Sequence, residues 1–201
     1  MRFRMNKPAI AALLAAVPLS GCISFAAKPP ASLLTLQPAA VLPAGEVQQS
    51  GTVKAVTIGP VNAPQELATT RVPVHSGPGG TTIAYVKDAQ WVEGPASLFG
   101  RLLADTVAAR TGRIVLSRRQ SLSTPSASLG GDLRSFGVDA TRMEAVVTFD
   151  AALGREGTQA FERRRFEARV PVAAIDTATV GPALNQAANQ VADQVADWVG
   201  K

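Results

Sequence analysis

The stretch MEAVVTFDAALGREGTQAFERRRFEARVPV, residues 143–172, decides the fold class of this chain. Apolar and polar side chains alternate on both sides of a turn expected at 154–157, and a period of two is typical of half-buried β-strands. One face of the second strand would carry Phe166, Ala168, Val170 and Val172, and the other face Arg163, Arg165, Glu167 and Arg169. The sequence therefore predicts a β-meander with one dry face.

Two amphipathic helices are predicted to cover that dry face. Gly94-Pro95 supplies an N-cap and a proline at the first helical position, and Gly112 ends this helix. The second helix, 180–198, repeats apolar residues at spacings of three and four, which places them on one side. Because each helix has a single apolar face to bury, we expect an α+β fold: a mostly antiparallel, mixed sheet with both helices on one face.

Shorter apolar runs predict the remaining strands. These are expected at 32–36, at 52–58 with Gly59-Pro60 as its end, at 113–116, at 131–137, and in a hairpin formed by 71–74 and 81–86. Residues 37–51 and 120–128 are expected to be loops, because they are rich in polar residues, proline and glycine.

The N-terminus has the parts of a secretory signal that ends at the only cysteine. A basic start and a short apolar run at 9–17 precede Leu19-Ser20-Gly21-Cys22. That run is shorter than the roughly 20 residues that a spanning helix needs. The pattern resembles the lipobox of bacterial lipoproteins, which implies cleavage between Gly21 and Cys22 and a covalent lipid on Cys22. A secreted protein with a chance cysteine is the alternative.

Cleavage would divide the chain into a removed signal at 1–21, a lipidated tether at 22–31 and one domain at 32–201. The signal is basic, so its removal lowers the formal net charge from +5, and the pI near 10 gives no ground for nucleic-acid binding. Ile23 follows the cysteine, where an aspartate tends to retain related lipoproteins at the inner membrane. Its absence implies the outer membrane.

The residues supply no constellation for catalysis or for a metal. His75 is the only histidine, and the adjacent Ser76 does not provide the geometry that a Ser-His-Asp site requires. The Gly-Pro-Gly-Gly run at 77–80 lacks the Lys-Ser/Thr of a phosphate loop and is interpreted as a hairpin turn. One histidine and one cysteine are too few for a metal cluster. We therefore expect no enzyme, no metal and no cofactor beyond the lipid on Cys22.

Five residues are candidates for contact with a partner or with phospholipid headgroups. Arg163, Arg165 and Arg169 share one strand face in the most charged stretch, and a solvated sheet face with acidic neighbours is the alternative. Trp91 precedes the first helix, and the alternative for it is a core anchor. Arg71 is the fifth candidate.

The segment 71–105 contains a distinctive set of residues. It comprises Arg71-Val72-Pro73-Val74, Tyr85, Trp91-Val92-Glu93-Gly94-Pro95, Leu98 and Leu102-Leu103-Ala104-Asp105. With the lipobox before it and an amphipathic helix at the end, this order resembles the ABC-type transport auxiliary lipoproteins, the PqiC-like group. The resemblance covers roughly 33–199.

The resemblance implies a non-catalytic lipoprotein on the periplasmic face of the outer membrane. Such a protein would dock an MCE-domain protein, which connects it to an inner-membrane ABC permease and ATPase in phospholipid transport. A homo-oligomer is an open expectation, because the sheet has open edges and the conduit partner is ring-like. The alternatives are a lipid-anchored periplasmic hydrolase and an assembly lipoprotein of another outer-membrane machine.

Overall fold

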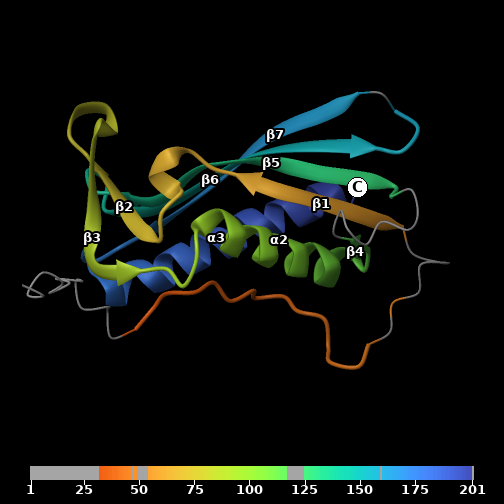
Figure 1. The fold of residues 1–201 in the computed structure, drawn as a ribbon, viewed down its shortest axis with the longest axis horizontal. Coiled ribbons are helices and arrows are strands. Elements are labelled where there is room, and N and C mark those ends of the chain that lie inside the picture. The colour runs from red at the N-terminus through yellow and green to blue at the C-terminus, as the bar shows by residue number, and fades with distance from the viewer. Residues whose placement is uncertain (1–31, 47, 49–53, 117–124, 159, 201) are drawn as a thin grey trace, which may run out of the picture.

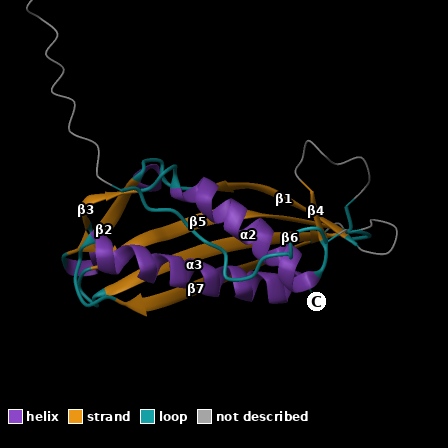
Figure 2. Ribbon diagram, turned by 90° about the horizontal axis from the view of Figure 1, so that it is seen from below, coloured by secondary structure: helices purple, strands orange, loops and turns teal. Residues whose placement is uncertain are grey.

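The computed structural model describes residues 32–46, 48, 54–116, 125–158 and 160–200, and Cys22 with the predicted signal and tether lies outside them. A seven-stranded sheet carries two long helices on one face (Figures 1 and 2). The strands are β1 (Ala55–Asn62), β2 (Arg71–Ser76), β3 (Thr82–Gln90), β4 (Ile114–Leu116), β5 (Ala127–Asp139), β6 (Glu144–Arg155) and β7 (Phe161–Pro171). The helices are α2 (Pro95–Thr111) and α3 (Thr177–Val199), with 3-10 turns η1 (Gln65–Leu67) and η2 (Pro78–Gly80). The predicted α+β class is confirmed.

Strand β5 organises the sheet. One of its edges pairs with β6 in a long antiparallel ladder, and β6 pairs with β7 in the same sense. The other edge is shared by β1, which runs parallel beside the first half of β5, and β2, which runs parallel beside its end. Strand β4 adds to β1 in parallel and β3 adds to β2 antiparallel. The longest ladders are antiparallel, as expected, whereas the parallel pairing of β1 and β2 with β5 was not predicted.

The core lies between the sheet and the helix layer. Alternation along the strands brings apolar side chains to this side, where α3 buries an unbroken stripe that includes Val191 and Val195. Phe99 of α2 packs on Phe149 of β6 with ring centroids 5.2 Å apart, and Phe166 of β7 packs on Trp198 of α3 at 5.5 Å. These pairs fix both helices against the same face.

Local signals set the ends of α2 as the sequence predicts, whereas α3 starts earlier than the predicted 180, at a cap that was not predicted. Helix α2 starts after Gly94 with Pro95 in its first turn, and Gly112 ends it with φ +65°, a conformation that glycine adopts without steric cost. The Gly112 N–H donates to the Ala108 carbonyl. The side chain of Asp176 caps α3 by accepting a hydrogen bond from the Thr179 N–H at 2.9 Å.

The strand predicted at 32–36 is wrong. Only Leu34 makes an isolated parallel bridge, to Trp91. Beyond it the chain runs along the helix layer, where the Gln37 N–H donates to Asn185 Oδ1 at 2.8 Å and the Ala39 N–H to Asn189 Oδ1 at 2.7 Å. These asparagines lie on α3 and satisfy the backbone in place of a neighbouring strand.

Three other predicted boundaries are also wrong. Gly59-Pro60 does not end β1, because the ladder with β5 resumes at Val61 after an irregularity. Proline is tolerated there because β4 pairs only with the start of β1 and leaves this edge open. Strand β5 begins at Ala127, inside the predicted loop, and β6 continues to Arg155, inside the predicted turn at 154–157.

Candidate functional site

The face of the sheet that no helix covers carries a network of ion pairs. Five arginines of β5, β7 and the β5–β6 turn each lie within 4.0 Å of at least one of five carboxylates. The arginines are Arg134, Arg142, Arg163, Arg165 and Arg169, and the carboxylates are Asp132, Asp139, Glu144, Asp150 and Glu167. The predicted arginine cluster therefore lies on a charge-balanced outer face, which matches the alternative of a solvated sheet face with acidic neighbours.

Asp150 forms the centre of this outer face. It lies directly opposite Arg165 in the β6–β7 ladder, and the guanidinium donates two hydrogen bonds, from Nε to Oδ1 at 2.6 Å and from Nη2 to Oδ2 at 2.7 Å. Arg134 approaches the same carboxylate at 3.8 Å. The hydrogen bonds from Arg165 lower the pKa of Asp150, against the opposing effect of burial.

Arg169 holds a second group of carboxylates nearer the β2–β3 hairpin. Its Nε donates to Glu167 Oε1 at 2.7 Å, and its Nη1 lies 3.2 Å from Glu144 Oε2 and 3.6 Å from Asp139 Oδ2. Thr148 Oγ1 donates to the other Glu167 oxygen at 2.9 Å. Burial raises the pKa of Glu167, but the hydrogen bonds from Arg169 and Thr148 outweigh it, and the pKa is lowered.

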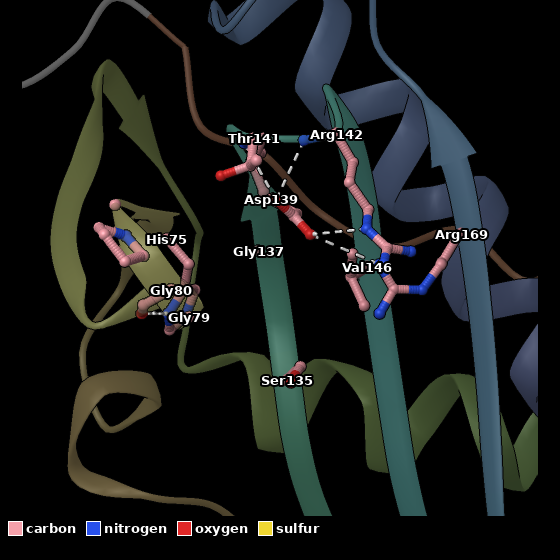
Figure 3. A pocket seen from close by; sticks show the side chains of 13 residues that line it. His75, Gly79, Gly80, Ser135, Gly137, Asp139, Thr141, Arg142, Val146 and Arg169 are labelled. Carbon is pink, nitrogen blue, oxygen red and sulfur yellow. Dashed lines mark hydrogen bonds and ion pairs between the residues drawn. The ribbon is translucent and has the colours of Figure 1, made fainter.

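A cleft of about 500 Å³ separates this group from the hairpin tip. Figure 3 shows His75, Gly79 and Gly80 on one side, Arg142 and Arg169 on the other, and Ser135 and Gly137 on the strand between them. A Cβ on Gly137 would lie 2.4 Å from the Pro73 carbonyl oxygen. Glycine at this position therefore lets β2 approach β5 closely and sets the width of the cleft.

The ionisable side chains that line the cleft have polar neighbours within the domain. His75 Nε2 lies 3.6 Å from Glu66 Oε1, and its Nδ1 lies 3.4 Å from the Gly80 carbonyl. The carboxylate of Asp139 accepts hydrogen bonds from the backbone of the β5–β6 turn and contacts Arg142 and Arg169. Among the described residues no group of three or more His, Cys, Asp or Glu side chains is placed to hold a metal ion.

The structure separates the two remaining candidates. Trp91 is 1% exposed and packs edge-on against Phe136 at 5.4 Å, which is the position that the core-anchor alternative predicts. Arg71 is exposed on the hairpin, with its guanidinium 3.8 Å from the centroid of the Tyr85 ring. It lies apart from the three arginines of the outer face. Gly21 and Cys22 lie outside the described residues.

Four of the five carboxylates of the outer face, all except Glu167, were missed in the sequence. Asp150, Glu144 and Asp139 come from β6 and β5, whereas the arginines that were singled out come from β7. The signal that could have found them is the register of the β6–β7 hairpin, which places Asp150 opposite Arg165. No helix in the described part of the chain has the length and apolar character needed to cross a membrane.

One family model and two solved structures match this chain. The model of the ABC-type transport auxiliary lipoprotein component matches residues 34–196. A crystal structure of a Xanthomonas campestris protein, assigned to DUF330, matches with a TM-score of 0.61 and 21% identity over 84% of this chain and 91% of that one. A crystal structure titled only as an uncharacterized protein gives a TM-score of 0.63 and 12% identity over 84% and 99%. Among curated proteins none matches.

Proposed function

Because the chain belongs to the ABC-type transport auxiliary lipoprotein component family, we propose that it is the docking subunit of an ABC transport system that moves phospholipids between membranes. In this role the domain is held at the periplasmic face of the outer membrane and binds the MCE-domain protein. That protein connects it with the permease and ATPase of the inner membrane. The subunit binds and positions its partner and catalyses no reaction.

The anchor in this proposal is a lipid on Cys22. The lipobox 19–22 supports it, and so does the family description, which names a lipoprotein. Several acyl chains on one cysteine would bind the bilayer far more tightly than a single chain, because each buried methylene contributes about 0.8 kcal/mol. The domain then needs no spanning segment of its own.

The outer face of the sheet is the proposed docking surface, and its uncovered ion-pair network is the observation that carries the proposal. The helices bury the opposite face, so the strands present charged side chains outward in fixed register. Charge patterns of this kind give an interface specificity and orientation more than affinity. The cleft beside Arg169 adds a concave feature in which a projecting loop of the partner can be seated.

Co-purification from membranes tests this proposal. The full chain, produced with its natural neighbours, should retain an MCE-domain protein and the ABC permease after mild detergent extraction. Arg169→Glu should reduce the retained partner, because it reverses the charge between Glu144, Glu167 and Asp139. Cys22→Ala should move the protein from the membrane to the soluble fraction.

The matched control is Arg110→Glu. Arg110 lies on the helix side, where it pairs with Asp193 and Asp197, so the same charge reversal should leave the partner bound. If the unaltered chain retains no MCE-domain protein, the proposed docking role is wrong. If both reversals weaken retention equally, the outer face is not the docking surface.

A further inference from the structure

The described chain enters the domain beside the end of β3. The Leu34 N–H donates to the Gln90 carbonyl at 2.7 Å, and the Val92 N–H donates to the Leu34 carbonyl at 2.9 Å. Leu34 and Trp91 thus form a short parallel bridge directly after β3. Strands β2 and β3 lie together at one end of the molecule (Figure 1). Any tether that precedes Leu34 therefore reaches the domain at this end.

Two apolar side chains are exposed at the same place. Leu33 is 49% exposed and Val92 is 52% exposed. Because side chains alternate along extended backbone, both point outward from the bridge, whereas Trp91 points into the core. Exposed apolar groups that adjoin one another mark contact surfaces more often than scattered ones do.

The charged residue next to Val92 in the sequence has a partner of opposite charge. Glu93, next to Val92, is bound to Arg101, and this hydrogen bond lowers its pKa. Asp176 uses its side chain to cap α3. The exposed Lys87 and Asp88 are neighbours of opposite sign on β3.

Arg71 brings a positive charge to the same end of the domain, because it lies opposite Gln90, the residue before Trp91. Its guanidinium lies over the half-buried ring of Tyr85. Lysine and arginine beside apolar surface can place the charge at headgroup level while the stem contacts the acyl boundary.

We propose that this end of the domain, through Leu33 and Val92, rests on the phospholipid surface to which the chain is tethered; the inference depends on the lipid anchor proposed at Cys22. Ser32 lies ten positions after Cys22 in the sequence, and a fully extended chain of ten residues spans at most about 36 Å. Direct contact is well within this reach. Tethering makes the contact intramolecular, with an effective concentration of the order of millimolar, so two side chains suffice where a free protein would dissociate.

The contact would set the orientation of the whole domain. Helix α3 starts near the membrane end and its 23 residues rise by about 35 Å towards the opposite end. The start of β7, where Phe161 is 73% exposed, would then lie farthest from the lipid (Figure 1). The sheet would then run along the membrane normal, and its outer face would be open to a partner that arrives from the periplasm.

Fluorescent probes on the lipidated full-length protein test this orientation. Val92→Cys and Phe161→Cys each supply one new thiol for an environment-sensitive label, since acylation blocks Cys22. The labelled proteins are reconstituted into phosphatidylethanolamine–phosphatidylglycerol vesicles that carry bromine on the acyl chains. The emission of the label at position 92 should shift to shorter wavelength and lose intensity to bromine quenching. The label at position 161 should keep the emission of a label that is surrounded by water.

Equal emission from both labels, or quenching at 161 alone, would overturn the inference. If the protein co-purifies with its MCE partner while the label at position 92 remains exposed to water, the proposed function stands and only the proposed membrane contact is wrong. Mass spectrometry that finds no acyl group on Cys22 would overturn the anchor and the orientation together.

Discussion

The two faces of the β6–β7 ladder differ although the same strands build both. On the side of the helices, Phe149 and Phe166 are at most 2% exposed and stack on aromatic rings of α2 and α3. On the other side, Asp150 and Arg165 form ion pairs in contact with solvent, and such pairs contribute about 0–1 kcal/mol each. The inner face therefore supplies the stability of the fold, and the outer face is free to carry a charge pattern for recognition.

The largest effect that this comparison predicts comes from the inner face. Phe149→Ala removes a fully buried ring that packs against Phe99 at 5.2 Å, and it should lower the free energy of unfolding by about 3–5 kcal/mol. Urea denaturation followed by circular dichroism measures the change.

The same substitution on the outer face is the control. Phe161 belongs to the neighbouring strand, is 73% exposed and lies on the outer side, so Phe161→Ala should change the free energy of unfolding by no more than about 0.5 kcal/mol. Similar losses for both variants would show that the two faces do not differ in the way described.

An intermediate effect is expected where the outer face meets the hairpin. Gly137→Ala would bring a methyl group within 2.4 Å of the Pro73 carbonyl oxygen, so β2 must move away from β5. Overpacking of this kind costs about 1–3 kcal/mol. Urea denaturation measures the loss, and amide hydrogen exchange should show faster exchange in the β2–β3 hairpin than elsewhere.

Gly130→Ala is the matched control on the same strand and face. A Cβ on Gly130 meets no atom within 4 Å, so this variant should unfold at the same urea concentration as the unaltered protein or slightly higher. If Gly130→Ala destabilises the protein as much as Gly137→Ala, the cost comes from losing glycine in a strand and the hairpin contact is not responsible.

The parts of the fold that could be predicted are those encoded by neighbouring residues. Helix α2 has Gly94-Pro95 at its start and Gly112 after its end, and both signals act within one turn. The pairing of β1 and β2 with β5 could not be predicted, because alternation shows which face a strand buries and says nothing about its neighbour. The contacts of Gln37 and Ala39 with α3 join segments about 150 residues apart, for which the sequence has no local signal.

The charge balance of the outer face depended on a hairpin register that the sequence left open. A four-residue turn at 154–157 would place Phe161 opposite Asp150, whereas the actual ladder places Arg165 there. A shift of register changes every cross-strand pair at once. The arginines and Glu167 were therefore recognised as one face, but the carboxylate partners on β5 and β6, and with them the charge balance of that face, followed only from the structure.

Apart from the two control substitutions, the smallest effect on stability is expected at the centre of the outer face. Asp150→Asn removes the charge that binds Arg165 and should lower the free energy of unfolding at pH 7 by at most about 1 kcal/mol. The folded-state pKa of Asp150 lies below its ordinary value of about 3.9, so its contribution is present above that value and is lost as the pH falls through the lowered pKa. The difference between the two proteins, measured by urea denaturation at a series of pH values, should shrink as the solution is made more acidic than about pH 4. High salt at pH 7 should reduce it as well, because it screens an ion pair that contacts solvent. A difference that persists unchanged in acid and in salt would mean that Asp150 acts through packing, and the outer face would then share in the stability that we assign to the inner one.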